Sequence, residues 1–218
     1  LPKDTIVTIR KEFLDEEGDS GLYVNEKWSL KNILDFSLLV SSNDGMRGIA
    51  SVAGAFGIGE NLEQADYNIG LKTFVNRMNN MAVRIGLNSM HFNNETGLDE
   101  PTNENGGYGS AYDTAKLMEY AMKKYPNILE ATRNKSEVIF SFDKKHLAKN
   151  TDPAVSKIPN LIGSKTGYTD ISGGNLVIAF DAGLGHPIII SILGSTYDGR
   201  FIDAIKLASS TLTYIKEN

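Results

Sequence analysis

The stretch Asn160-Leu-Ile-Gly-Ser-Lys-Thr-Gly-Tyr-Thr-Asp-Ile-Ser-Gly-Gly-Asn-Leu-Val-Ile-Ala-Phe180 places a lysine, a threonine and a glycine in succession along a predicted strand. Lys165 supplies a point charge and Thr166 a directed O–H, while Gly167 lets a ligand backbone lie where any Cβ would block it. Such an edge suits a carboxylate ligand. A tight turn is the alternative interpretation of the tripeptide, so the neighbouring sequence has to decide between the two.

The residues that follow predict an antiparallel hairpin. Residues 175–180 and 187–193 carry strand signals, and the Gly183-Leu-Gly185 segment between them is typical of a turn. From Phe201 to Ile215, apolar residues recur three and four positions apart, which predicts a closing helix with one apolar face on this sheet. The Lys-Thr-Gly stretch is therefore expected on a sheet.

The composition is that of an ordinary globular protein. Of the 218 residues, 41% are hydrophobic and 22% are charged, which is enough for one domain or one domain with a lobe. A net charge of -5 without any Lys/Arg run argues against a nucleic acid or an anionic membrane surface as partner. The absence of cysteine excludes thiolate chemistry, and three scattered histidines do not suggest a metal site. No membrane-spanning run or signal peptide is visible.

Helices are predicted between strands at the two ends of the chain, without repeats or linkers. The predicted elements are a strand from Thr5 to Ile9, an acidic turn at 15–18, an extended piece from Gly21 to Val24, a helix capped by Ser29, helices from Gly45 to about Phe56 and from Tyr67 to Ile85, a polar loop from Gly97 to Gly109, a helix from Ser110 to about Lys124, and a hairpin at 137–142. The long third helix has a predicted core face that includes Met78 and Met81.

Several motifs occur in the order found in one enzyme family. Ser41-Ser42-Asn43, between two predicted helices, and the later Lys-Thr-Gly match two motifs of penicillin-binding proteins and class A β-lactamases. The segments that resemble the serine D-alanyl-D-alanine carboxypeptidases, the low-molecular-mass penicillin-binding proteins, are Met78-Asn-Asn-Met-Ala, the stretch from Gly86 to Asp99, Tyr108-Gly-Ser-Ala-Tyr-Asp113, and Leu193-Gly194 with Arg200-Phe-Ile-Asp-Ala204. The resemblance runs from about Asp4 to the C-terminus.

This resemblance implies an α+β fold of the β-lactamase and transpeptidase type, with an antiparallel sheet packed with helices and a helical lobe beside it. Residues 1–218 are then expected to form a single penicillin-binding/transpeptidase-like domain. Its lobe would lie at about 28–135, its sheet strands at about 160–194, and its closing helix at about 198–216.

The resemblance also implies site residues for acyl transfer. They are Ser41, Asn43 and Lys165 for catalysis and Thr166, Gly167 and Tyr168 for substrate binding. Ser41 would relay a proton, Asn43 would hold the substrate amide, and the Lys-Thr-Gly residues would bind a terminal carboxylate. The backbone N–H of Tyr168 would form half of an oxyanion hole.

The implied substrate is a peptidoglycan stem peptide ending in D-Ala-D-Ala, with β-lactams as inhibitors and with no metal, cofactor or nucleic acid. The implied location is extracytoplasmic, in the periplasm or on the outer face of the bacterial cytoplasmic membrane. Membrane association is expected only through segments outside this chain.

The chain lacks one motif of the family at the expected position. The nucleophile motif, Ser-x-x-Lys, should precede Ser41, and no such sequence lies there. The single match, Ser141-Phe-Asp-Lys144, follows the Ser-x-Asn motif and sits in an alternating strand that ends in a lysine-rich turn, so we interpret it as a decoy. The chain opens with Leu1-Pro-Lys-Asp-Thr5, where the nucleophile helix would just have ended, and N-terminal truncation is the simplest account.

Three further segments concern substrate detail. His91 is a tempting base, but in the family pattern it belongs to a structural loop. Asn150-Thr151-Asp152 borders the site by analogy, although Asn and Asp before a proline are also ordinary turn formers. Met90 stands in place of the usual threonine, and Glu95-Thr96 in place of Pro-His.

Two other functions stay open. One is a noncatalytic peptidoglycan-binding module that has the same fold and has lost its nucleophile in evolution, which the gene sequence upstream of Leu1 would decide. The other is a serine β-lactamase, which shares the fold and the Lys-Thr-Gly motif, although the segment from His91 to Asp99 fits the carboxypeptidases better.

Overall fold

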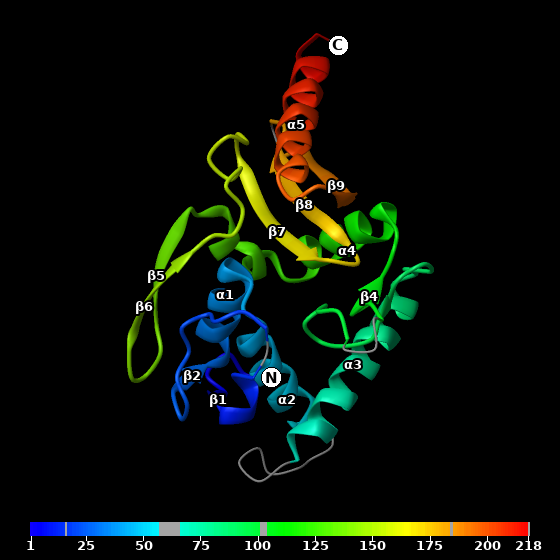
Figure 1. The fold of residues 1–218 in the computed structure, drawn as a ribbon. Helices are drawn as coiled ribbons and strands as arrows, with labels where there is room; N and C mark the ends of the chain where they lie inside the picture. The colour runs from blue at the N-terminus through cyan, green and yellow to red at the C-terminus, as the bar shows by residue number, and fades with distance from the viewer. Residues whose placement is uncertain (16, 57–65, 101–103, 184, 218) are drawn as a thin grey trace.

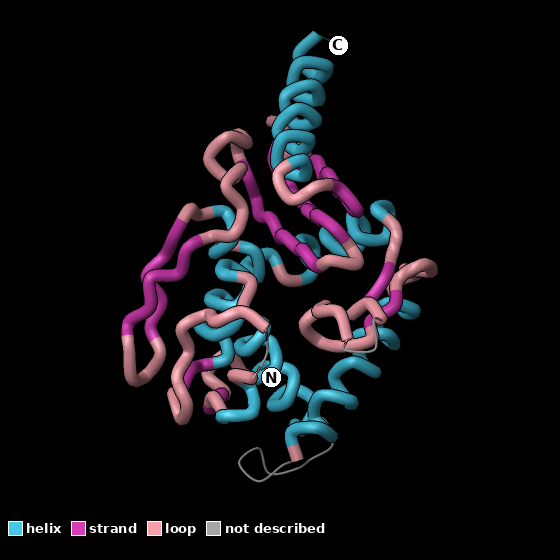
Figure 2. The backbone as a smooth tube through the Cα atoms, viewed as in Figure 1, coloured by secondary structure: helices cyan, strands magenta, loops and turns pink. Residues whose placement is uncertain are grey.

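The computed structural model describes residues 1–15, 17–56, 66–100, 104–183 and 185–217. The acidic turn predicted at 15–18, the polar loop at 97–109 and the turn at 183–185 each include residues outside these ranges. Figures 1 and 2 show an α+β arrangement in which a small antiparallel sheet and the C-terminal helix stand at one end and a mainly helical body at the other. The predicted fold class is confirmed. The predicted domain limits stay a prediction.

A three-stranded sheet carries the Lys-Thr-Gly motif. Strands β7 (Leu161–Thr169), β8 (Gly173–Asp181) and β9 (Pro187–Ser195) are antiparallel and lie in that order, so β7 is an outer strand. Lys165 is paired with Val177, and Gly167 with Asn175. The predicted hairpin is therefore confirmed, and the motif lies along a strand and not in a turn.

Helices cover both faces of this sheet. Helix α5 (Gly199–Glu217) packs Phe201 and Ala204 against Ile178 and Phe180, as its apolar periodicity predicts. On the other face lie α4 (Ala111–Lys124) and the short η2 (Pro126–Leu129), which bury Ala179 of β8. Residues alternate between the two faces along each strand, so β8 supplies both cores.

The helical body starts from the N-terminal segment. Strand β1 (Ile6–Thr8) pairs with β2 (Lys27–Ser29), and the short η1 (Lys11–Phe13) lies between them. The predicted extended piece from Gly21 to Val24 is wrong, because Gly21 (φ 77°) and Asn25 (φ 66°) turn the backbone at either end of it. The strand forms immediately after that turn.

Two helices meet at the Ser-x-Asn motif. Helix α1 (Leu30–Val40) is capped as predicted, because the Ser29 Oγ accepts the Asn32 N–H at 3.3 Å. Helix α2 (Asn43–Phe56) begins two residues earlier than predicted, since the Ser42 Oγ accepts the Gly45 N–H at 2.9 Å. A core around Trp28 holds α1 and α2 together.

Helix α3 (Tyr67–Arg84) packs closely on α2 through two glycines. A Cβ on Gly54 would lie 1.8 Å from the Gly70 carbonyl oxygen, so the two backbones touch where side chains are missing. The apolar face predicted for this helix is only half-buried among the described residues, and Met78 lines a cleft. That face is therefore not the closed core face that its periodicity predicts.

Two short antiparallel pairs complete the fold. Strand β3 (His91–Phe92) pairs with β4 (Gly107–Tyr108), and β5 (Ser136–Phe140) pairs with β6 (Lys145–Lys149) after the short η3 (Ala131–Arg133). The hairpin predicted at 137–142 is thus longer than expected, and its second strand begins at Lys145. In the part of the chain that the structure describes, no helix is long and apolar enough to cross a membrane.

Candidate active site

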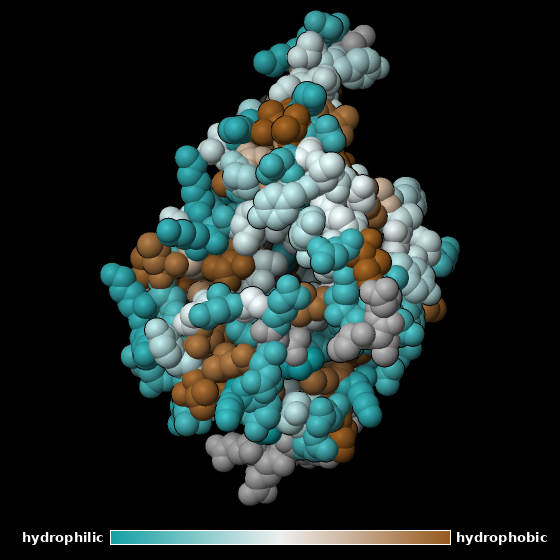
Figure 3. All heavy atoms as spheres, viewed as in Figure 1, coloured by the Kyte–Doolittle hydropathy of each residue, from teal (hydrophilic) through white to brown (hydrophobic). Residues whose placement is uncertain are grey.

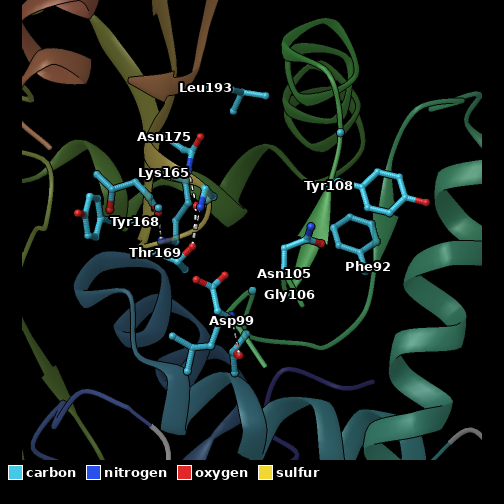
Figure 4. A pocket seen from close by; sticks show the side chains of 18 of the residues that line it. Phe92, Asp99, Asn105, Gly106, Tyr108, Lys165, Tyr168, Thr169, Asn175 and Leu193 are labelled. Carbon is cyan, nitrogen blue, oxygen red and sulfur yellow. Dashed lines mark hydrogen bonds between the residues drawn. The ribbon is translucent and has the colours of Figure 1, made fainter. Parts of the chain in front are cut away.

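A cleft of about 760 Å³ lies between the outer strand β7, the junction of α1 and α2, and the β3–β4 region. All six residues predicted for the site line it, namely Ser41, Asn43, Lys165, Thr166, Gly167 and Tyr168. The structure thus brings together side chains more than a hundred residues apart in the sequence. Figure 4 shows Lys165, Tyr168 and Thr169 on one wall and Phe92 and Tyr108 on the other.

Lys165 links the two sequence motifs directly. Its Nζ donates to the Ser41 Oγ at 2.6 Å and to the Thr166 carbonyl oxygen at 2.6 Å. Ser41 ends α1 in the left-handed region, with φ 57° and ψ 48°. A non-glycine residue in this region is strained, and such strain is concentrated at functional sites. The strained turn aims the Ser41 hydroxyl at the lysine on the facing strand.

The environment of Lys165 makes its ammonium group more acidic. Burial, followed by the nearby positive charge of Arg200, lowers the pKa of Lys165 to about 8. At neutral pH the side chain is still mostly protonated, so it supplies a positive charge in a partly desolvated place. A small rise in pH lets it give up its proton, which is the behaviour needed for proton exchange with Ser41.

Thr166 points its hydroxyl toward the segment that follows β6. Its Oγ1 lies 2.6 Å from the Thr151 Oγ1, and Thr166 is buried whereas Thr151 is exposed. Of the segment Asn150–Asp152, only Thr151 lines the cleft. Asn150 instead donates to backbone carbonyls, and the buried Asp152 accepts the Ala154 N–H at 2.8 Å, so both hold the turn.

Arg200 is a cleft residue that the sequence analysis did not predict as part of the site. It is 3% exposed, and its guanidinium donates to the Gly167 carbonyl oxygen. Its Cζ lies 4.7 Å from the ring centroid of Tyr197 and 5.8 Å from that of Tyr168. A cation in the first turn of α5 is unfavourable for the helix dipole, and this was the one local signal that could have marked it.

Asn43 lines the cleft from the first turn of α2, and its amide nitrogen donates to the Glu17 carbonyl oxygen at 2.8 Å. The neighbouring Ser20 Oγ contacts the Ser42 Oγ at 2.7 Å. The segment 17–20 therefore braces the Ser-x-Asn turn from outside. This contact leaves the other end of the Asn43 amide, its Oδ1, as the acceptor that could serve a ligand.

Two residues weighed as catalytic differ in position, because His91 lines the cleft and Ser141 does not. His91 is exposed on β3 and stacks on Tyr108 with 5.6 Å between ring centroids. Ser141 lies in the β5–β6 turn, where its Oγ accepts the Lys144 N–H at 2.8 Å and donates to Glu26 at 2.7 Å. Ser141 is not among the residues that line the cleft, which agrees with its interpretation as a decoy.

Glu95, which stands where the family pattern has proline, forms an ion pair inside the fold. Its Oε1 forms an ion pair with the Arg47 Nε at 2.9 Å, and Glu95 is buried. This pair ties the loop after β3 to α2, so the replacement preserves the wall of the cleft. Over the described ranges, no group of three or more His, Asp or Glu residues could hold a metal ion.

Comparison with known proteins places these features in one family. The family model described as D-alanyl-D-alanine carboxypeptidase, Peptidase_S11, matches residues 2–196. The chain is 31% identical over 191 residues to the D-alanyl-D-alanine carboxypeptidase DacA of Haemophilus influenzae, covering 87% of this chain and 46% of that protein. It is 27% identical over 179 residues to DacB2 of Mycobacterium tuberculosis, covering 82% of this chain and 55% of that protein. The chain thus spans about half the length of these two relatives.

A solved structure agrees with these sequence matches. A D-alanyl-D-alanine carboxypeptidase from Mycobacterium tuberculosis superimposes with a TM-score of 0.74 at 25% identity, covering 95% of this chain and 75% of that one. A mutant of a Streptomyces DD-transpeptidase gives a TM-score of 0.79, also at 25% identity, covering 94% of this chain and 78% of that one. Both similarities extend over nearly the whole described fold.

Proposed function

The chain belongs to the peptidase S11 family of D-alanyl-D-alanine carboxypeptidases, and from this membership we propose that its cleft binds the D-Ala-D-Ala end of a peptidoglycan stem peptide for acyl transfer. The observation that carries the proposal is the bond from the Lys165 Nζ to the Ser41 Oγ at 2.6 Å, next to the Thr166 hydroxyl. This arrangement brings a cation, a directed hydroxyl and a proton relay together where β7 faces the junction of α1 and α2.

In the proposed complex, the terminal carboxylate of the substrate lies against β7. Lys165 supplies its positive charge and Thr166 its hydroxyl, and the buried Arg200, bonded to the Gly167 carbonyl oxygen, adds positive potential from the lining of the cleft. Since Gly167 has no Cβ, the substrate backbone can lie alongside the strand as an added extended segment. The Tyr168 N–H then serves the carbonyl that is attacked, as a donor of the oxyanion hole.

Ser41 is suited to proton relay because Lys165 donates to its oxygen. The Ser41 hydroxyl hydrogen is then left to point at the leaving nitrogen of D-alanine, and Lys165, with its pKa of about 8, can replace the proton that Ser41 gives up. Asn43 would orient the substrate amide through its Oδ1. Acyl transfer further requires a nucleophilic serine, and we propose that this serine is not among residues 1–218, since Ser141 lies outside the cleft.

We place this activity outside the cytoplasm, where stem peptides ending in D-Ala-D-Ala occur, and β-lactams would be inhibitors because they imitate that end. Nothing in the proposed chemistry uses a metal or a cofactor. The periplasm and the outer face of the cytoplasmic membrane are both compatible with it.

The test is D-alanine release from a pentapeptide stem. A Ser-x-x-Lys segment of the family's pattern is joined upstream of Leu1, and the joined protein is assayed beside its Lys165→Met variant. We expect release by the first protein and a loss of at least about a hundredfold in the variant, since both charge and proton exchange are removed. Hydrolysis of penicillin without D-alanine release would favour a β-lactamase instead.

A further inference from the structure

The β5–β6 ribbon has one face turned away from the rest of the protein. Three cross-strand pairs form this outer face, namely Ser136 with Lys149, Val138 with Leu147, and Phe140 with Lys145. The apolar members are well exposed, with 42% of Val138, 56% of Phe140 and 61% of Leu147 accessible to solvent. An exposed face with both large apolar side chains and charges requires an explanation, because apolar groups at this density mark interaction sites.

The inner face of the same ribbon is firmly attached. Ile139 and Ala148 are buried in the core around Trp28, and the His146 Nε2 lies 2.6 Å from the Glu26 Oε1. The Asn32 amide also donates to the Phe140 carbonyl oxygen at 2.8 Å. The outer face is therefore held in place by the fold, and a partner would not have to order it on binding.

The turn of the ribbon extends the apolar surface. Phe142 is 64% exposed, although its N–H donates to the Lys27 carbonyl oxygen at 2.8 Å and so fixes the backbone. Ser141 closes the turn, and the Lys144 Nζ lies 3.3 Å from the ring centroid of the exposed Tyr23. The Ser-x-x-Lys sequence thus builds the tip of this surface. We call the outer face of β5–β6 with Phe142 and Lys144 the ribbon surface.

The charged residues of the outer cross-strand pairs are both lysines, Lys145 and Lys149, while the turn carries Lys144 and the exposed Asp143. Glu137 belongs to the opposite face, and the Asp143 carboxylate accepts the Lys27 N–H at 2.8 Å. Figure 3 shows hydrophobic and hydrophilic residues side by side along the left edge, where Figure 1 has β5 and β6.

We propose that the ribbon surface binds the headgroup region of an anionic lipid bilayer. Phe140, Phe142 and Leu147 would enter the boundary between headgroups and acyl chains, while the lysines pair with lipid phosphates. A lipid surface fits this face because protruding apolar side chains beside lysines are the combination that binds the interface of an anionic bilayer. The net charge of -5 and the absence of a Lys/Arg run argued against such a surface. They do not reveal it, because the alternation of side chains along β6 places lysines that are separated in sequence on one face.

The ribbon surface and the cleft are separate. No residue of β5, β6 or their turn lines the cleft, so a bilayer on the ribbon would leave the cleft open to its ligand. The inference therefore does not rest on the proposed function, and it can be tested without an activity assay.

The experiment is co-sedimentation of the purified protein with vesicles of phosphatidylglycerol and phosphatidylcholine, compared with pure phosphatidylcholine. We expect binding to the anionic vesicles that weakens as salt is added. The double variant Lys145→Gln with Lys149→Gln should bind about 30-fold more weakly, at about 1 kcal/mol per lysine. The double variant Phe140→Thr with Leu147→Thr should lose at least about tenfold, because apolar burial is removed while β-branched residues keep the strands.

The matched control is Lys123→Gln with Lys124→Gln, which removes the same charge from the exposed end of α4. This control should bind as the unchanged protein does, and circular dichroism should show all variants folded. Equal loss in the α4 control, equal binding to neutral vesicles, or no binding to either vesicle would overturn the proposal. A lipid-free dimer that Phe140→Thr dissociates would overturn it as well, because the face would then join two copies.

Discussion

The variant Thr166→Val tests whether the Thr166 hydroxyl binds the ligand's carboxylate or only stabilises the fold. Valine keeps the β-branched shape on β7 and removes only the Oγ1, which lies 2.6 Å from the Thr151 Oγ1. A hydrogen bond to a charged group contributes about 1.5–3 kcal/mol, so we expect the affinity for a diacetyl-Lys-D-Ala-D-Ala ligand to fall about 10- to 150-fold. Thr166 is only 8% exposed, which favours the upper part of this range because water competes poorly there.

Thr151→Val is the matched control for this measurement. Both variants lose the same hydroxyl–hydroxyl bond, so both should lose about 0.5–1.5 kcal/mol of folding free energy in urea unfolding. Only Thr166→Val should weaken the ligand in isothermal titration calorimetry, and its effect should disappear when the ligand's terminal carboxylate is replaced by an amide. Equal weakening of the acid and the amide, or equal weakening by the two variants, would show that the Thr166 hydroxyl does not bind the carboxylate.

Three further outcomes follow from the same cleft. Because burial and the Arg200 charge hold the pKa of Lys165 at about 8, affinity for the carboxylate ligand should be constant below pH 7 and then fall by up to about tenfold per pH unit above 8, and a flat calorimetric profile would contradict this. Gly167→Ala should fold normally, since its Cβ would meet only the Asn175 Cβ at 3.7 Å. Its binding free energy for the same ligand should nevertheless be weaker by about 1–3 kcal/mol, because the Cβ would stand where the ligand backbone lies. Unchanged affinity would show that the ligand does not approach Gly167 closely. Residues 1–218 should form no covalent adduct with a fluorescent penicillin, and mass spectrometry that located a label on Ser41 or Ser141 would show that a nucleophile is present.

The lowered pKa of Lys165 also bears on stability, with a definite sign. The folded lysine loses its proton near pH 8, whereas the unfolded lysine keeps it to about 10.5, so the unfolded chain binds more protons between these values. Stability from this group therefore rises with pH across that window and is lowest where Lys165 is charged in both states. Burying a protonated lysine, and holding it near Arg200, thus costs folding free energy, which is expected of a binding group.

The sheet could be predicted because its signals are local. Alternating apolar residues, the glycine-bounded turn and the three- and four-residue periodicity of the closing helix each lie within one short window, and β7, β8, β9 and α5 formed as expected. Strand β6 could not be predicted, because Lys145-His-Leu-Ala-Lys149 has no strand composition. It forms a strand because its register with β5 buries Ala148 and His146 against the core around Trp28.

The cleft residues likewise divide into those that the sequence predicted and those that only the folded chain reveals. The motif order predicted that Ser41 and Lys165 belong to one site, and their side chains do meet. Thr151, which the resemblance suggested only by analogy, does line the cleft. Arg200 escaped prediction because its role depends on a contact with Gly167 that only the folded chain brings about. The sequence around Arg200 carries only the weak signal of a cation at the start of a helix, which does not reveal that contact.

The most direct test of the central claim is where the ligand binds. In ¹H–¹⁵N NMR spectra of the chain titrated with diacetyl-Lys-D-Ala-D-Ala, we expect the largest shift changes on residues 165–168 and 41–43. The diastereomer ending in D-Ala-L-Ala should leave those signals unchanged at the same concentration. Shift changes elsewhere in the chain, or equal changes with both ligands at 165–168, would contradict the claim that this cleft recognises the D-Ala-D-Ala end.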